Sequence, residues 1–238
     1  MKGLNIITPV KDSIALSELT IRSILTSELP IPFTYTVYND NSTPENTSRL
    51  HNLSEELGFS LVDVSVHTEH PSPNYLWVLR QAQRVSLAQD YALLIVESDV
   101  KVKPDTLRRL YEEALLRDDC GIAAAVTVDE QGHTNYPYEQ ARKYPTGAVR
   151  VKRHLSFCCS LLKPAFLRSY DFRRLNPKKA WFDVDISRQS SKKGFANYLF
   201  TDLTVLHHPH GSRPWKLLKY RHPLKYYWRK FIGGLDKI

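Results

Sequence analysis

The sequence predicts an α/β protein with a Rossmann-like, mostly parallel sheet flanked by helices. Strand-like runs alternate with helical patterns along the first hundred residues, and polar loops follow several of the strands. The 238 residues are 42% hydrophobic and 11% aromatic, which is enough for a large core. Such alternation is typical of βαβ units, in which parallel strands open on one edge of the sheet. Open α/β sheets bind ligands outside the carboxyl ends of their strands.

The first elements have clear boundaries. The apolar run Leu4–Val10 predicts a strand, and residues 13–29 have apolar side chains close to helical spacing. Residues 34–38 predict a second strand. The pair Thr43-Pro44 is typical of a helix start, with a capping hydroxyl and a proline at the first helical position. Gly58 is typical of the end of that helix.

The later elements become less regular. In the first half we expect a strand over residues 59–66, a helix over 75–88, a strand over 91–96 and a helix over 104–116. In the second half we expect strands over residues 121–128, 157–162 and 195–206, and a short helix over 187–193. A polar loop over residues 129–149 lies between them, and long loops inside compact domains are often functional.

The most informative stretch is ALLIVESDVKVKP, residues 92–104. A buried-strand pattern ends in Glu97-Ser98-Asp99, so two carboxylates emerge where the strand leaves the core. Carboxylate oxygens are the usual protein ligands of a Mg²⁺ or Mn²⁺ ion that also binds the phosphates of a substrate. The alternative is a solvated strand end, since 25 acids in this length produce roughly two or three such pairs by chance. The stretch suggests a metal–diphosphate site.

Charge and cysteine content narrow the class of protein. Residues 213–238 contain eight Lys and Arg residues and one acidic residue. Because the whole chain has a net charge of +8, the remaining residues, 1–212, are almost neutral. This distribution disfavours nucleic-acid binding, which prefers a basic face on the folded domain. No apolar run is long enough to span a membrane, and the first residues lack a signal-peptide core. Three cysteines make no disulfide framework, so we expect a cytoplasmic, reduced protein.

Four segments, in order, resemble the family-2-type glycosyltransferases, which have the GT-A fold. They are IITPVKD at residues 6–12, VYNDNST at 37–43, ESD at 97–99 in place of the family's DxD, and WFDVDI at 181–186 followed by Gly194-Phe195. The resemblance covers residues 3–212. It implies a catalytic domain over residues 1–212, with a nucleotide-binding half (1–104) and an acceptor-binding, catalytic half (105–212).

The resemblance implies how the donor is held. Asp40 would accept hydrogen bonds from a nucleobase or ribose, with Pro9 and Asp12 lining the same pocket. A turn and helix cap at residues 39–43 is the alternative. Asp99 would bind the Mn²⁺ or Mg²⁺ that bridges the phosphates. Glu97 is one methylene longer than the family's first Asp, so we expect it to contact metal-bound water or ribose.

The resemblance also implies an acceptor side. Asp183 stands where the family has its general base, which takes the proton from the acceptor hydroxyl and leads to inverted configuration. Phe182 replaces the family's usual Glu. Asp185 points the other way if the segment is extended, or caps the following helix. Trp181, beside the expected base, is the candidate for stacking on the acceptor.

A histidine cluster follows the last expected strand. On an extended chain, His208 and His210 share a face and His207 opposes them. The family often has a metal-binding histidine here, and imidazole suits Mn²⁺ better than Mg²⁺. We expect His208 or His210 to be a ligand, although the sequence leaves the choice among the three open. A hydrogen-bonded core histidine is the alternative.

The C-terminal segment 213–238 interleaves basic and aromatic residues and predicts an amphipathic helical tail. This composition suits the headgroup region of an anionic membrane; packing on the domain or an oligomer contact are the alternatives.

Together these features predict an inverting glycosyltransferase that moves a sugar from a nucleoside-diphosphate sugar to a glycan or lipid-linked acceptor in polysaccharide biosynthesis. The alternative is a non-catalytic protein whose tail engages nucleic acid or membrane.

Overall fold

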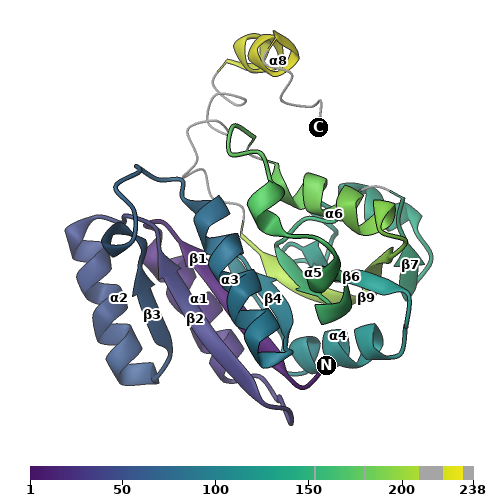
Figure 1. Ribbon diagram of the computed structural model, residues 1–238, viewed down its shortest axis with the longest axis horizontal. Coiled ribbons are helices and arrows are strands. Elements are labelled where there is room, and N and C mark those ends of the chain that lie inside the picture. Colours follow the sequence, from purple (N-terminus) through teal and green to yellow (C-terminus); the bar gives the residue numbers. More distant parts are fainter. Residues whose placement is uncertain (153, 180, 209–221, 233–238) are drawn as a thin grey trace.

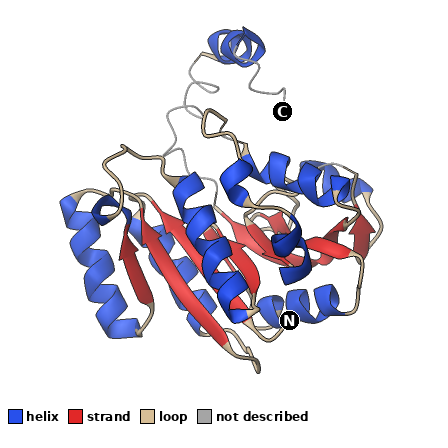
Figure 2. Ribbon diagram, in the orientation of Figure 1, coloured by secondary structure: helices blue, strands red, loops and turns tan. Residues whose placement is uncertain are grey.

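The structure is a computed structural model, which describes residues 1–208, except 153 and 180, and residues 222–232. The described strands form one nine-stranded sheet in the order β3-β2-β1-β4-β8-β6-β9-β5, with β7 on the outside of β9 (Figures 1 and 2). The strands are β1 (Leu4–Val10), β2 (Phe33–Asn39), β3 (Ser60–Asp63), β4 (Ala92–Val96), β5 (Val100–Lys101), β6 (Cys120–Val128), β7 (Ala148–Arg150), β8 (Cys159–Leu162) and β9 (Ala196–His207).

The direction of the strands decides which ends meet. β1, β2, β3 and β4 are parallel neighbours, and β6 is parallel to β9. β8 runs antiparallel between β4 and β6, so the carboxyl ends of β4, β6 and β9 lie at the same edge of the sheet. β5 and β7 pair antiparallel with β9. The mostly parallel α/β fold predicted from the sequence is confirmed.

Helices cover both faces of the sheet (Figure 1). One hydrophobic cluster packs α1 (Ile14–Leu25), α2 (Pro44–Leu57) and α4 (Thr106–Leu115) on one face. A second cluster packs α3 (Tyr75–Gln89), α5 (Pro164–Ser169) and α6 (Phe182–Lys192) on the other. β4 is buried along its whole length, as expected for a strand between two helical layers.

The boundaries of α2 follow from its own sequence. Thr43 Oγ1 accepts a hydrogen bond from the backbone N–H of Asn46 at 3.4 Å, and Pro44 occupies the first helical position. Gly58 ends the helix with a positive φ of 74°, a conformation that costs glycine little. Both predicted ends of this helix are confirmed.

Other elements differ from the sequence prediction. The third strand ends at Asp63, and a short 3-10 helix, Val64–Val66, follows it. The expected helix over 187–193 begins earlier, since α6 starts at Phe182 and holds Asp183 and Asp185 in its first turn. Acidic residues there are favourable because the amino-terminal end of a helix carries partial positive charge. The expected loop over 129–149 contains a 3-10 helix, Glu139–Lys143, and the start of β7.

The tail contains α8 (Pro223–Ile232). Leu224 is 87% exposed and Trp228 is 67% exposed, whereas Tyr226 is buried. The rest of the tail lies outside the described residues, and the division of residues 1–212 into two halves stays a prediction. None of the described helices combines the length and apolar character that crossing a membrane requires.

Candidate functional site

The candidate site lies where the carboxyl ends of β4 and β9 meet the start of β8. Val96 of β4 pairs with Cys159 of β8, so the residues just outside this pair, Glu97 and Cys158, face each other. The backbone N–H of Glu97 donates to the carbonyl of Cys158 at 2.9 Å. The β4–β8 pairing therefore fixes Glu97, the first residue of the acidic motif Glu97-Ser98-Asp99, against the start of β8.

The end of the acidic motif is fixed against β9. Val100 opens β5 and pairs with His207, the last residue of β9. The backbone N–H of His208 donates to the carbonyl of Asp99 at 2.9 Å. Asp99 is only 5% exposed, and its Oδ2 lies 3.5 Å from Nε2 of His207. The β5–β9 pairing thus places an imidazole beside the carboxylate predicted to bind metal.

The orientation of His207 is fixed by its second ring nitrogen. Nδ1 lies 2.7 Å from the carbonyl oxygen of Tyr136, so Nδ1 carries the proton and donates to it. The side chain of Asn135 donates to the backbone carbonyl of His207 at 3.0 Å. Burial lowers the pKa of His207, but the neighbouring carboxylates of Asp99 and Glu97 outweigh burial and raise it. The loop before the 3-10 helix therefore aims Nε2 at the acids.

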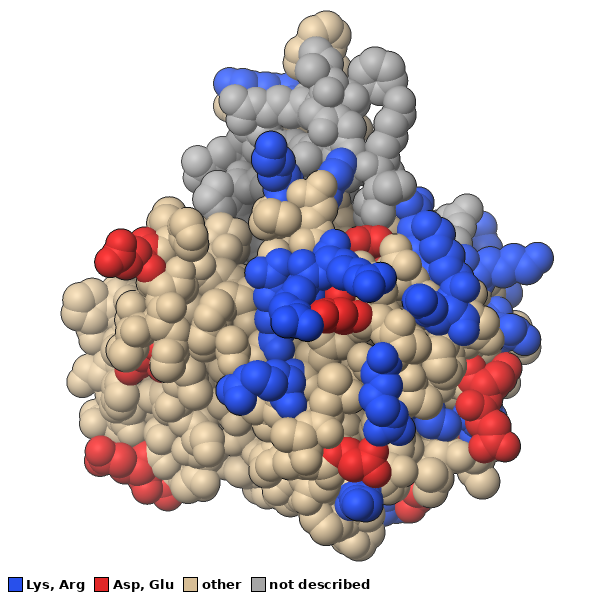
Figure 3. Space-filling model, in the orientation of Figure 1, with Lys and Arg blue, Asp and Glu red and all other residues tan. Residues whose placement is uncertain are grey.

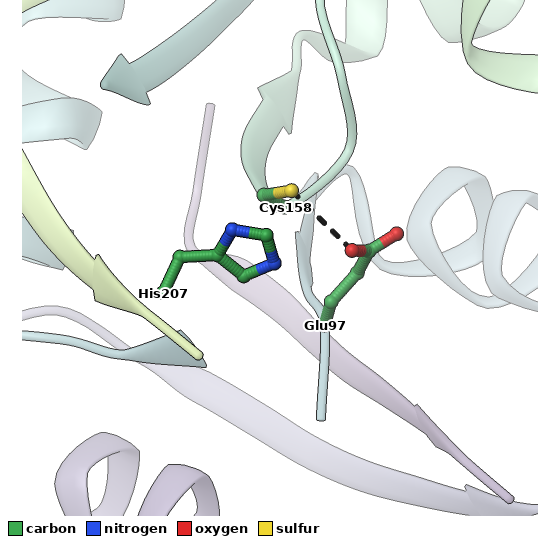
Figure 4. Close-up of side chains that lie close together, drawn as sticks. All are labelled: Glu97, Cys158 and His207. Carbon is green, nitrogen blue, oxygen red and sulfur yellow. Dashed lines mark hydrogen bonds between the residues drawn. The ribbon is translucent and has the colours of Figure 1, made fainter. Parts of the chain in front are cut away.

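A cysteine completes the cluster. The thiol of Cys158 donates to Oε2 of Glu97 across 3.3 Å, and ligand atoms of Glu97, Cys158 and His207 all lie within 4.8 Å of one another. Figure 4 shows the three side chains pointing toward one another from three separate segments. Burial, and next the charge of Glu97, raise the pKa of the Cys158 thiol well above its usual range. Without a cation the sulfur is therefore a neutral thiol.

These residues fit the divalent cation that the sequence predicts. Carboxylate oxygens and an imidazole nitrogen are ligands for Mn²⁺. Metal-binding histidines commonly donate their other ring N–H to a carbonyl, as His207 does to Tyr136. Nε2 of His207 is buried and makes no regular hydrogen bond to the described residues. Glu97, Asp99 and His207 are the residues that would hold the ion.

Asp40 organises the loop in front of α3. Its Oδ2 accepts hydrogen bonds from Ser72 Oγ at 2.7 Å and from the backbone N–H of Asn74 at 2.8 Å. Its Oδ1 accepts one from Asn74 Nδ2 at 2.8 Å. Asp40 is 7% exposed, and its backbone N–H bonds to the end of β1 at Val10. The carboxylate thus orders the loop before α3, beside the ends of β1 and β2 where the nucleotide is predicted to bind.

Asp12 ties β1 to the start of α2. Its Oδ1 accepts hydrogen bonds from the N–H of Thr43 at 2.8 Å and from Asn46 Nδ2 at 3.1 Å. Burial raises the pKa of Asp12, but these hydrogen bonds and the charge of Lys11 outweigh it, so the pKa is lowered. Pro9 is half-buried within β1. The roles of Pro9, Asp12, Asp40 and Glu97 in nucleotide binding stay predictions.

Asp183 and Trp181 lie at the amino-terminal end of α6, and both are half-buried. The charge of Asp183 helps to raise the pKa of Tyr138, after burial and Cys158. The hydroxyl of Tyr138 donates to the carbonyl of Ser156 at 3.2 Å and accepts from its N–H at 2.9 Å. Since Ser156 Oγ lies 3.3 Å from Cys158 Sγ, Tyr138 adjoins the segment that carries Cys158.

The structure shows which of the three clustered histidines has its ring beside Asp99, a choice that the sequence leaves open. His207 is the imidazole beside Asp99, whereas His208 meets Asp99 through its backbone. His210 lies outside the described residues, and the ligand roles of His208 and His210 stay predictions. In the sequence, Cys158 lies in the apolar run FCCSLL, residues 157–162, which is typical of a buried strand. Only its pairing opposite Glu97 reveals its place in the site.

Basic side chains gather on the face covered by α3 and α5 (Figure 3). Exposed arginines of these elements and of the neighbouring 3-10 helix Phe172–Arg174 include Arg84, Arg168 and Arg173. Arg168 pairs with Asp90 at 2.8 Å, and Arg173 pairs with Asp171 at 2.7 Å. Two of these three arginines are thus paired with acids, which agrees with the almost neutral charge of residues 1–212.

Comparison with known proteins identifies the fold. No protein-family model matches the chain, and no curated protein matches it in sequence. Among solved structures, S. aureus TarS 1–349 has a TM-score of 0.64 at 16% identity, covering 91% of this chain and 62% of that one. Its complex with UDP-GlcNAc gives the same score over 98% of this chain and 66% of that one.

A second similar protein is the mannosyltransferase PcManGT from Pyrobaculum calidifontis in complex with GDP-Man and Mn²⁺. Its TM-score is 0.59 at 16% identity, over 96% of this chain and 64% of that one. The chain thus spans slightly less than two thirds of TarS 1–349 and of PcManGT, and 38% of the longer TarS chain. Both are GT-A-type glycosyltransferases, so the GT-A fold predicted from the four sequence segments is confirmed.

Proposed function

We propose that this protein is a divalent-metal-dependent glycosyltransferase that uses a nucleoside-diphosphate sugar. The observation that carries the proposal is that Glu97 and Asp99, which follow β4 at the carboxyl edge of a GT-A sheet, each have a carboxylate oxygen close to a ring nitrogen of His207. Complexes of similar structures with UDP-GlcNAc and with GDP-Man and Mn²⁺ support this donor class. The base and the sugar are left to experiment.

Each part of the site has a task in this proposal. A bound cation supplies positive charge that stabilises the departing diphosphate. Asp99 and His207 hold it, and Glu97 contacts the ion, its water or the ribose. The loop that Asp40 orders and the turn that Asp12 fixes form the walls of the nucleotide pocket. These interactions position the donor before reaction, which lowers the entropic part of the barrier.

Asp183 is proposed as the general base. It is half-buried in the first turn of α6, and its charge acts on Tyr138, which adjoins the segment that carries Cys158. Its carboxylate would take the proton from the acceptor hydroxyl as that oxygen attacks the anomeric carbon from the face opposite the leaving group. The product then has inverted configuration. Trp181, which precedes the helix, is the proposed stacking surface for the acceptor.

Transfer from a panel of UDP-, GDP- and dTDP-sugars tests this proposal. With Mn²⁺ present, one donor should release its nucleoside diphosphate when an acceptor is added. Asp183→Asn should keep donor binding and lose about 10²–10⁴-fold in transfer rate, the usual contribution of a general base. Transfer at the wild-type rate in this variant would exclude Asp183 as the base. Asp185→Asn is the matched control, because Asp185 lies on the same helical turn and should tolerate the change.

The acceptor is proposed to be a glycan or a lipid-linked hydroxyl at the inner face of a membrane. The support is α8, on which Leu224, Tyr227 and Trp228 are exposed among basic residues. Such helices lie in the headgroup region of anionic bilayers. Liposome flotation of the full chain and of a chain ending at residue 212 tests this contact. Equal flotation of both would contradict it.

A further inference from the structure

The cation cluster contains a sulfur atom. The Sγ atom of Cys158 lies 3.3 Å from Oε2 of Glu97, and both lie within 4.8 Å of a ring nitrogen of His207. The three residues come from the end of β4, the start of β8 and the end of β9, so the sheet itself sets their spacing. Cys158 and His207 are each 2% exposed, which keeps the cluster largely shielded from bulk water.

This donor set suits a different cation from Mn²⁺. Thiolate and imidazole ligands favour Zn²⁺ and other thiophilic ions, whereas Mg²⁺ and Mn²⁺ prefer oxygen. A site with one sulfur, one nitrogen and carboxylate oxygens supplies the four-coordinate shell that Zn²⁺ adopts. Asp99, with Oδ2 3.5 Å from the imidazole, is placed to supply a second oxygen.

The imidazole provides a second, independent observation. Nε2 of His207 is buried and makes no regular hydrogen bond to the described part of the chain. Its direction is fixed because Nδ1 is bonded to the carbonyl of Tyr136 at 2.7 Å. The described partner of Nε2 is the carboxylate of Asp99, whose Oδ2 lies 3.5 Å away, beyond the usual N–H···O distance. A cation bound between Nε2, the thiol and the carboxylates would satisfy this buried nitrogen more fully.

We propose that Glu97, Cys158 and His207 bind Zn²⁺ or a similar thiophilic cation, and that this cation excludes Mn²⁺ from the same carboxylates. On binding, a sulfur–metal bond forms, the S–H bond breaks and its proton leaves to solvent. Binding of the thiophilic cation is independent of the proposed function. The effect of this cation on the enzyme does rest on the proposed function, since exclusion of Mn²⁺ would weaken the binding of the donor diphosphate.

The competing explanation is that Cys158 only positions Glu97 through the S–H hydrogen bond. The variant Cys158→Ser distinguishes the two explanations, because its hydroxyl can still donate a hydrogen bond to Glu97 but the sulfur ligand is gone. Cys159→Ser is the matched control, because Cys159 is the next residue, is also buried, and belongs to no such cluster among the described residues.

The test is titration of the metal-free full chain with Zn²⁺, Cd²⁺ and Mn²⁺, without nucleotide. Wild type and Cys159→Ser should give a sulfur-to-Cd²⁺ charge-transfer absorption at one equivalent. Cys158→Ser should lose that absorption and bind Zn²⁺ about 10²-fold more weakly, or about 2.7 kcal/mol. Its Mn²⁺ affinity should change little.

Wild-type Zn²⁺ affinity in Cys158→Ser, or equal weakening of Zn²⁺ and Mn²⁺, would overturn the proposal. The charge-transfer absorption is measured on the wild-type chain as well, so its absence there overturns the proposal even where a variant fails to fold. Mn²⁺-dependent binding of UDP or GDP to the wild type is measured separately. If the wild type binds Zn²⁺ but shows no Mn²⁺-dependent binding of UDP or GDP, the proposed function is contradicted and the Zn²⁺ proposal is not.

Discussion

Replacing Asp40 with alanine should loosen the loop before α3, which we propose as one wall of the nucleotide pocket. The carboxylate accepts three hydrogen bonds, one from Ser72 and two from Asn74. Asn74 is 7% exposed, so the two hydrogen bonds that it donates to Asp40 would be lost in a buried place, although Nδ2 keeps a second bond to the carbonyl of His70 at 3.0 Å. Ser72 is half-buried, and its hydroxyl can bond to water instead.

The magnitude follows from these exposures. A hydrogen bond to a charged group contributes about 1.5–3 kcal/mol, and the lower figure suits a site at the edge of a sheet. Counting only the two buried donors of Asn74, Asp40→Ala should lower the free energy of unfolding by about 3 kcal/mol. Ser72→Ala removes only the half-buried donor and should cost about 1 kcal/mol or less.

Urea unfolding followed by circular dichroism measures the difference. With a slope of about 3 kcal/mol/M, the midpoint of Asp40→Ala should fall by about 1 M, and that of Ser72→Ala by about a third of this. Hydrogen exchange should also become faster at residues 67–74. A midpoint shift in Asp40→Ala no larger than that in Ser72→Ala would refute the reasoning, because the buried donors would then contribute nothing.

Three further substitutions test other parts of the fold by the same unfolding measurement. Asp12→Ala should lower the free energy of unfolding by about 1 kcal/mol, because Asp12 accepts hydrogen bonds from Thr43 and Asn46. Because the pKa of Asp12 is lowered from 3.8, its contribution should be complete above that pH and disappear as pH falls through the lower folded-state pKa; a difference from wild type that grows on acidification would contradict this. Gly121→Ala should cost about 1–3 kcal/mol by overpacking, since a Cβ there would lie 2.3 Å from Ser190 Oγ and 2.7 Å from Phe195 Cβ; wild-type stability would show that the strand shifts freely. Lys163→Met should cost about 2 kcal/mol, because the buried ammonium donates to the carbonyls of Ala114 and Arg117; an unchanged midpoint would show that water replaces it.

The first half of the fold was predictable because its signals are local. The run Leu4–Val10, the pair Thr43-Pro44 and Gly58 each specify their own backbone conformation through sterics or capping. The parallel order of the strands then follows from the helical connections between them.

The second half depends on contacts between distant segments. The sequence does not show that β8 runs antiparallel between β4 and β6, or that Val100 pairs with His207. The early start of α6 has a local signal in the pair Asp183 and Asp185, because acidic residues are favourable in the first turn of a helix.

The same contrast holds within the candidate site. Asp99 was predictable as a candidate ligand because it ends a buried strand. His207 could not be chosen over its neighbours, since its orientation depends on the carbonyl of Tyr136, 71 residues away. Cys158 enters the site only through the register of β4 and β8. The hydrogen bonds that Asp40 accepts from Ser72 and Asn74 depend on how the loop before α3 folds back.

The most direct test of the central claim is the binding of UDP and GDP by calorimetry, with and without Mn²⁺. We expect Mn²⁺ to strengthen binding of one of them at least tenfold in the wild type, or about 1.4 kcal/mol. Asp99→Asn should lose this dependence, while Asp202→Asn, an exposed acid paired with Arg109, should keep it. Nucleotide binding that is absent, or that is equally strong without Mn²⁺ and in Asp99→Asn, would contradict the assignment of this cluster as the cation site of a glycosyltransferase.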